Sequence, residues 1–177
     1  SYEGYTKYPR YIMAGYNVMA EEIIDQIKDR PLPTHIFLQG GVGSFPGAIC
    51  GYFWEKFPGN NIKFVVVESE HAPCLIRSAQ NNQMTSINVK QETMMAGLSC
   101  GEPSLLGWEI LRSGTDDFIT INDSSIPGLM RLLAKNNLKI EAGESSVAGL
   151  AGLIESMEDQ KIAKAMGLNK ESIVLLF

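Results

Sequence analysis

The segment at residues 39–44, QGGVGS, carries the strongest chemical signal in the sequence. Its glycines follow an apolar run typical of a buried strand and precede a stretch with the composition of a helix. Glycine lets backbone N–H groups approach an anion closely, and a helix start adds unpaired N–H groups at the positive end of its dipole. The segment therefore predicts a phosphate site, to which the hydroxyl of Ser44 can also donate. A tight strand-to-helix turn without a ligand is the simpler alternative.

Known nucleotide-binding patterns fit this segment only in part. Gly41, Gly43 and Gly47 form a loosened dinucleotide fingerprint, and Glu68 ends the next apolar run where a ribose-binding acid belongs. The third glycine comes one residue late, however, and Pro46 interrupts the motif. A P-loop is excluded, because no Gly-Lys-Ser/Thr sequence follows the glycines.

A second candidate is the small-residue segment EAGESSVAGLAG at residues 141–152. Its small side chains allow a helix to pack closely on a sheet and allow a flat ring to lie near the backbone. Glu144 and Ser145 are the polar residues at the expected start of this helix. We expect them to contact a ligand or, in the simpler interpretation, to cap the helix.

The order of the expected elements predicts an α/β fold. Strands are expected over residues 35–39, 62–68, 117–121 and 172–177. Helices are expected over residues 18–28, 45–56, 72–81, 105–112, 123–135, 144–157 and 162–166. This alternation favours a mostly parallel sheet covered by helices on both faces, a three-layer α/β/α arrangement. Ligands of such sheets bind at the carboxyl ends of the strands, so residues 40–44, 65–69 and 142–146 are expected to share one rim.

The composition is that of one folded domain spanning residues 1–177. The 177 residues carry a formal net charge of -5 and are 45% hydrophobic, which is ordinary for a globular chain. The acidic balance argues against nucleic-acid binding, which needs a basic face. No apolar run reaches the roughly 20 residues of a membrane helix, and no secretory signal is visible. We therefore expect a cytoplasmic location, with no nucleic-acid and no membrane partner.

Five segments together resemble the diaminopropionate ammonia-lyase family, over nearly the whole chain. They are YEGYTKYPRYIMAGY (2–16), QGGVGSFPGA (39–48), VVVESEHAPCL (65–75), MAGLSCGEPSLLGWEILR (95–112) and AGESSVAGLAGL (142–153). That family belongs to the fold type II pyridoxal-phosphate enzymes. The resemblance implies the large domain of such an enzyme, which is similar to the tryptophan synthase β chain. It also implies pyridoxal 5'-phosphate (PLP) as cofactor, a small amino-acid substrate, and α,β-elimination of 2,3-diaminopropionate to pyruvate and ammonia. Relatives suggest a homodimer.

The resemblance also assigns binding roles to individual residues. In this fold the glycine loop binds the cofactor phosphate through backbone N–H groups. By resemblance, this role falls to Gly40, Gly41, Val42, Gly43 and Ser44. The segment that contains Glu144 and Ser145 corresponds to the stretch beside the cofactor ring.

The family's catalytic residues are expected outside this sequence. The Schiff-base lysine lies upstream in the family, the catalytic aspartate precedes the segment that matches residues 2–5, and a stretch near the pyridine nitrogen follows Phe177. Lys7 matches a different family segment, so we do not assign it the Schiff-base role. We expect a fragment of a longer enzyme that is inactive by itself.

Two alternative functions stay open. One keeps the fold and cofactor but acts on serine or threonine, and the other is a Rossmann-like nucleotide-binding module. No metal is expected, because His71 after Glu68 and Glu70 reads best as a solvated helix start. Cys74 and Cys100 could meet in a disulfide, but reduced thiols are the preferred interpretation for a cytoplasmic protein.

Overall fold

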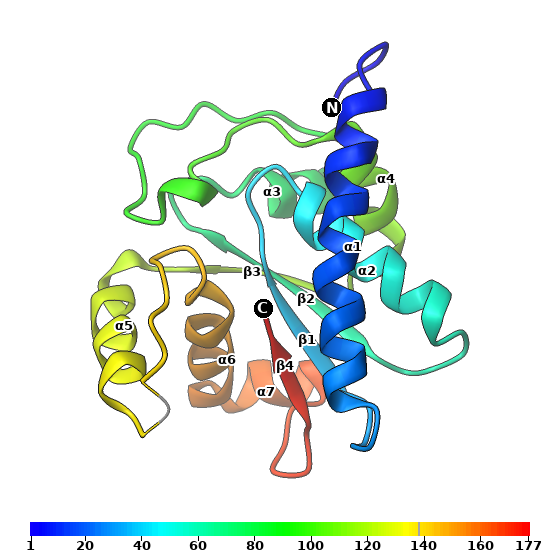
Figure 1. Ribbon diagram of the computed structural model, residues 1–177. Helices are drawn as coiled ribbons and strands as arrows, with labels where there is room; N and C mark the ends of the chain where they lie inside the picture. Colours follow the sequence, from blue (N-terminus) through cyan, green and yellow to red (C-terminus); the bar gives the residue numbers. More distant parts are fainter. Residues whose placement is uncertain (138) are drawn as a thin grey trace.

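Four parallel strands form the centre of the fold (Figure 1). The computed structural model describes residues 1–137 and 139–177. The strands are β1 (His35–Gln39), β2 (Lys63–Ser69), β3 (Asp117–Ile121) and β4 (Val174–Leu176), in the order β3-β2-β1-β4. Their β-branched and aromatic residues suit a pleated sheet that is buried on both faces. All four strands lie where the sequence predicts them.

Helices cover both faces of the sheet, which confirms the predicted three-layer α/β/α fold. One face carries α1 (Lys7–Ile27), α2 (Ser44–Lys56), α3 (Cys74–Asn81) and α4 (Leu105–Gly114). The other face carries α5 (Ile126–Lys135), α6 (Ala148–Glu158) and α7 (Gln160–Met166). Two 3₁₀ turns, η1 (Ala96–Leu98) and η2 (Asp123–Ser125), complete the elements. In the described part of the chain, no helix is long and apolar enough to cross a membrane.

Alternation along the strands divides the core between the two helical layers. Phe37 and Val67 pack with α5, α6 and α7, whereas Ile36, Leu38 and Val66 pack with α1 to α4. Successive side chains of a strand point to opposite faces, so each strand serves both layers. In β1, odd-numbered residues therefore point to the face that carries α5, α6 and α7, and even-numbered residues point to the opposite face.

The strand order reverses direction at β1. The chain runs from β1 outward to β2 and β3, and then returns to place β4 on the other side of β1. Ligands of open α/β sheets bind in the crevice outside the carboxyl ends of the strands at such a switch point. The fold thus places the binding crevice beyond Gln39 and Leu176.

Two helix starts differ from the prediction by four residues or more. α1 begins at Lys7 rather than at residue 18; Pro9 is compatible because it lies in the first turn, where its missing N–H costs little. α6 begins at Ala148 rather than at residue 144. The N–H and the hydroxyl of Ser146 both donate to the Gly143 carbonyl, and such local hydrogen bonds compete with a helix.

Two helical glycines provide a test of the packing. A Cβ at Gly114 would lie 1.9 Å from the Trp54 ring, whereas a Cβ at Gly128 would meet nothing within 4 Å. We expect Gly114→Ala to lower the free energy of unfolding by about 1–3 kcal/mol through overpacking. Gly128→Ala should raise it by about 0.5–1 kcal/mol through helix propensity. Urea unfolding followed by circular dichroism measures both, and equal effects of the two changes would contradict this packing.

Candidate functional site

The glycine loop between β1 and α2 presents free backbone donors. Gly43 adopts the left-handed conformation with φ of 92°, which glycine reaches without strain. Among the described residues, none accepts a hydrogen bond from the N–H groups of Gly41, Gly43 or Ser44. The Val42 N–H faces the thiol of Cys100, where it partly offsets the rise in the Cys100 pKa that burial causes. The carbonyls of the loop, in contrast, are engaged: Val42 O accepts from Ser104 N at 2.7 Å and Gly41 O from the Cys74 thiol at 3.5 Å. The loop is therefore a set of donors oriented for an anion.

Gly40 has a different role from the rest of the loop. Its N–H donates to the Val67 carbonyl at 2.8 Å, so it continues the sheet and cannot serve a ligand. A Cβ at Gly40 would lie 2.7 Å from Val66 Cγ1 and 3.1 Å from Glu68 Cγ. Glycine therefore allows the chain to pass close to the side chains of β2 and α3 at this position.

A cavity of about 500 Å³ adjoins the loop. It is lined by Tyr16, Met19, Gln39, Gly41, Val42, Gly43, Ser44, Phe45, Pro46, Gly97, Leu98, Cys100, Ser145, Ser146 and Phe177. Two of the three segments expected at this rim, residues 40–44 and 142–146, thus meet here, together with the ends of β1 and β4 at the switch point, whereas residues 65–69 do not line the cavity. Of the predicted site residues, Gly40 and Glu144 do not line the cavity; Glu144 is half-buried in the turn before α6. The volume suits a cofactor-sized ligand.

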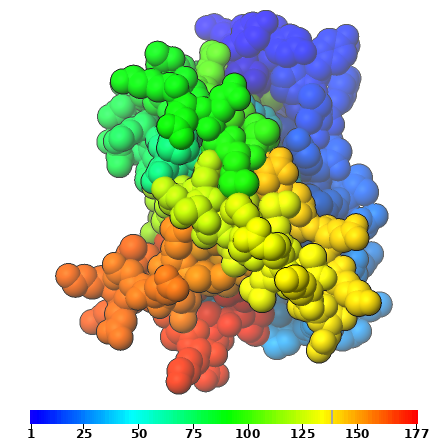
Figure 2. All heavy atoms as spheres, turned by 90° about the vertical axis from the view of Figure 1, so that its left-hand side faces the viewer, coloured from blue at the N-terminus to red at the C-terminus, as the bar shows by residue number. Residues whose placement is uncertain are grey.

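Ser145 joins two walls of this cavity. Its Oγ accepts a hydrogen bond from Gly97 N at 3.2 Å, which ties the turn before α6 to η1. Figure 2 shows the irregular segment 82–104 in green, at the top of the molecule above α5 and α6. The sequence prediction included Ser145 but missed Gly97 and Leu98, because no local pattern in the irregular segment marks them as cavity-lining.

Asp123 holds the irregular segment in place. Its carboxylate accepts hydrogen bonds from Thr93 Oγ1 at 2.6 Å and from Met94 N at 2.7 Å. Burial opposes ionisation of Asp123, but these hydrogen bonds hold its pKa below the usual value. At the 3₁₀ turn η2, the Asn122 side chain rather than that of Asp123 accepts a hydrogen bond from Ser124 N. Asp123 therefore positions the segment that carries Gly97.

Glu68 lies buried behind the glycine loop. Its two oxygens accept hydrogen bonds from Leu75 N at 2.8 Å and Ile76 N at 2.7 Å, at the start of α3. Burial raises the pKa of Glu68 to about 7 despite these two donors. Glu68 does not line the cavity, so it cannot bind a ribose there. This placement removes the main support for the dinucleotide pattern.

In the described part of the chain, the cysteines form no disulfide and the side chains around His71 form no metal site. All three cysteines are free; Cys100 lines the cavity, and burial raises the pKa of Cys74 and Cys50. No group of three His, Cys, Asp or Glu side chains in residues 1–137 and 139–177 could hold a metal ion. His71 instead lies 3.3 Å from Gln91 Nε2 and 3.9 Å from the Glu70 carboxylate.

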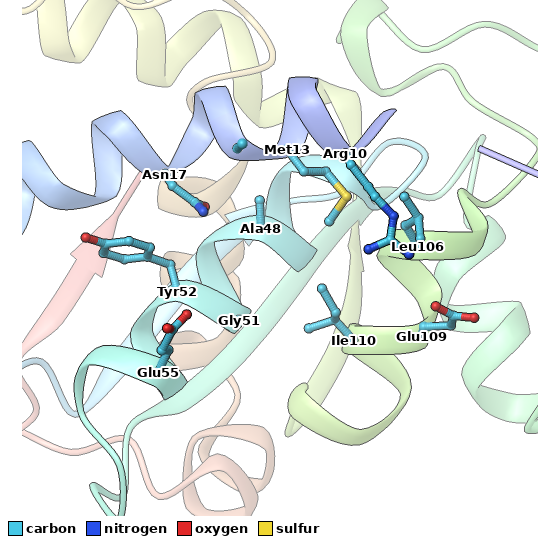
Figure 3. A pocket seen from close by; sticks show the side chains of 11 residues that line it. Arg10, Met13, Asn17, Ala48, Gly51, Tyr52, Glu55, Leu106, Glu109 and Ile110 are labelled. Atoms are coloured by element: carbon cyan, nitrogen blue, oxygen red, sulfur yellow. The ribbon is translucent and has the colours of Figure 1, made fainter. Parts of the chain in front are cut away.

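A second hollow of about 450 Å³ lies between α1, α2 and α4 (Figure 3). Small residues such as Ala48 and Gly51 leave it open, and Arg10, Glu55 and Glu109 lie at its rim. None of the predicted site residues lines it. The glycine-loop cavity is therefore the candidate site.

Comparison with known proteins defines the class. The family model described as "Pyridoxal-phosphate dependent enzyme" matches residues 3–177, and the chain belongs to this family. It is 37% identical over 184 residues to diaminopropionate ammonia-lyase of Escherichia coli (strain K12), covering 99% of this chain and 46% of that protein. It is 30% identical over 155 residues to a probable D-serine dehydratase of Carboxydothermus hydrogenoformans, covering 81% of this chain and 36% of that protein.

A solved structure supports the fold along the whole chain. The crystal structure of the Escherichia coli ammonia-lyase, in complex with an aminoacrylate-PLP azomethine reaction intermediate, superposes with a TM-score of 0.89 at 37% identity. The match covers 99% of this chain and 46% of that one. The chain thus spans about half the length of the curated relatives it matches.

The raised pKa of Glu68 predicts how the free energy of unfolding depends on pH. Because its pKa is raised from 4.5 to about 7, the folded state binds the proton more tightly than the unfolded state. The stabilisation is complete below about pH 4.5 and is lost as pH rises through 7, an effect on the order of 3 kcal/mol. We expect Glu68→Gln to flatten the decline of unfolding free energy between pH 4.5 and 7.

Chemical denaturation at a series of pH values measures this slope. The exposed Glu55 provides the control, because Glu55→Gln should leave the slope unchanged. An identical slope in wild type and Glu68→Gln would contradict a buried, proton-binding Glu68.

Proposed function

We propose that the protein is a PLP-dependent lyase that eliminates ammonia from 2,3-diaminopropionate to give pyruvate. The observation that carries the proposal is the row of free N–H groups facing a cavity at the switch point of this fold. The 37% identity to the Escherichia coli ammonia-lyase, over 99% of this chain, supports the substrate class.

The residues of the cavity fit the cofactor in charge and shape. None of the lining residues carries a charged side chain, so no carboxylate there repels a phosphate. The N–H groups of Gly41, Val42, Gly43 and Ser44 would hold the phosphate, with the Ser44 hydroxyl as a further donor. Phe45 and the other apolar lining residues offer a dry surface for a flat ring.

The remaining lining residues would orient the ligand and exclude water. The hydrogen bond between Ser145 and Gly97 joins two walls of the cavity, and Leu98 and Phe177 add apolar surface to its lining. Bound PLP would supply the electron-withdrawing ring that stabilises negative charge on the substrate. No lysine or aspartate lines the cavity, so we assign no catalytic residue among these side chains.

We further propose a cytoplasmic homodimer. The outer face of α1 supports an interface, because Tyr8, Tyr11, Ile12 and Val18 are exposed by 57–63% on it. Exposed apolar and aromatic patches of this kind mark protein–protein contacts.

Multi-angle light scattering tests the proposed homodimer. The dimer should give way to monomer when Tyr11 and Ile12 are both changed to Asp.

Two positive-φ glycines test the phosphate site. Gly43 and Gly59 have φ of 92° and 79°, so an alanine at either position is strained. A Cβ at Gly43 would also press on Leu75 at 3.0 Å, whereas one at Gly59 meets nothing within 4 Å. We expect Gly43→Ala to weaken PLP binding by at least tenfold in calorimetry and Gly59→Ala to leave it unchanged. Binding of NAD without binding of PLP would favour the nucleotide-binding alternative.

Pyruvate release tests the reaction. With PLP and 2,3-diaminopropionate, the chain by itself should release no pyruvate above background, because the cavity holds no lysine. The Escherichia coli enzyme with these 177 residues in place of its aligned segment should release pyruvate, and the Gly43→Ala chimera much less. A folded, PLP-loaded chimera that acts faster on serine or threonine would contradict the proposed substrate.

A further inference from the structure

Gln39 occupies a distinctive position in the cavity. It is the last residue of β1 and lines the cavity next to the glycine loop. By strand alternation its side chain shares the face of Phe37, which packs with α6. The loop after Gln39 instead leads to α2 on the opposite face. The Gln39 side chain therefore points to the Ser145 side of the cavity and away from the start of α2.

The side-chain amide of Gln39 has no protein partner. Its Oε1 is shielded from solvent and, among the described residues, meets no hydrogen-bond donor; none of them accepts a hydrogen bond from its Nε2 either. A buried amide oxygen without a partner destabilises a fold by about 1–3 kcal/mol. Such groups are rare in native proteins and call for a specific cause. Here the neighbouring space is a ligand cavity, so a bound molecule is the available partner.

We propose that the Gln39 amide hydrogen-bonds the pyridoxal part of the bound cofactor, at the end away from the phosphate. This inference rests on the proposed function and adds a residue that the sequence analysis did not single out. An amide suits the position because it can both donate and accept a hydrogen bond. It also adds no charge to a cavity whose lining residues carry none.

The variant Gln39→Met separates a ligand contact from a structural role. Methionine has a similar length without polar N or O atoms, so it removes the unsatisfied amide and leaves little space. We expect the urea midpoint of the PLP-free chain to rise and the dissociation constant of PLP to increase about tenfold. Affinity for inorganic phosphate should stay unchanged, whereas Gly43→Ala should weaken both PLP and phosphate.

Ser156 provides the matched control. Its Oγ is also buried without a partner among the described residues, but Ser156 does not line the cavity. Ser156→Ala should raise the urea midpoint and leave PLP binding unchanged.

Three results would overturn the inference. Wild-type affinity for PLP in Gln39→Met would exclude the contact, and a lower urea midpoint of that variant without PLP would indicate a structural role. Equal loss of PLP and inorganic phosphate would place the contact at the phosphate instead. A wild-type chain that binds no PLP would contradict the proposed function itself, and this inference with it.

Discussion

The donors of the glycine loop stay free because two helix starts touch backbone to backbone. A Cβ at Gly107 in α4 would lie 2.5 Å from the Gly43 carbonyl oxygen and 3.0 Å from Ser44 N. This contact, with the hydrogen bond from Ser104 N to Val42 O, holds the loop's carbonyls toward the protein. The opposite side of each peptide then presents its N–H to the cavity. An anion site made of backbone N–H groups depends on such packing. The main chain sets the direction of each N–H group, which no rotation of a side chain can adjust.

The free N–H donors at the starts of α3 and α2 differ in whether the protein supplies an acceptor. At α3 the buried Glu68 carboxylate accepts from Leu75 N and Ile76 N, so the anion is part of the protein. At α2 the N–H groups of Gly41, Gly43 and Ser44 have no acceptor in the described part of the chain. Glu68 lies close behind Gly40, but its raised pKa lowers its charge near neutral pH. The Glu68 side chain therefore repels a bound phosphate less than a fully ionised carboxylate would.

Local sequence patterns predicted most of the fold and, within the candidate site, the glycine loop and Ser145. The strands around Phe37 and Val66 and the loop at Gly43 follow from composition and spacing within a few residues. The walls formed by Tyr16, Gly97 and Phe177 depend on tertiary packing of distant segments, and no local period encodes that. The start of α6 was predicted four residues early, because hydrogen bonds of Ser146 to Gly143 compete with helix formation.

The groups that line the cavity are better suited to binding a ligand than to transferring protons. An elimination moves protons at the α-carbon and at the departing amine, and each needs an acid or base within hydrogen-bond reach. The cavity supplies backbone N–H groups, hydroxyls, an amide and the thiol of Cys100, but no carboxylate, imidazole or amine. Backbone donors and the Gln39 amide can bind and orient a ligand without changing its protonation. It follows that any carboxylate, imidazole or amine that transfers protons in the proposed reaction must come from groups other than the side chains lining this cavity.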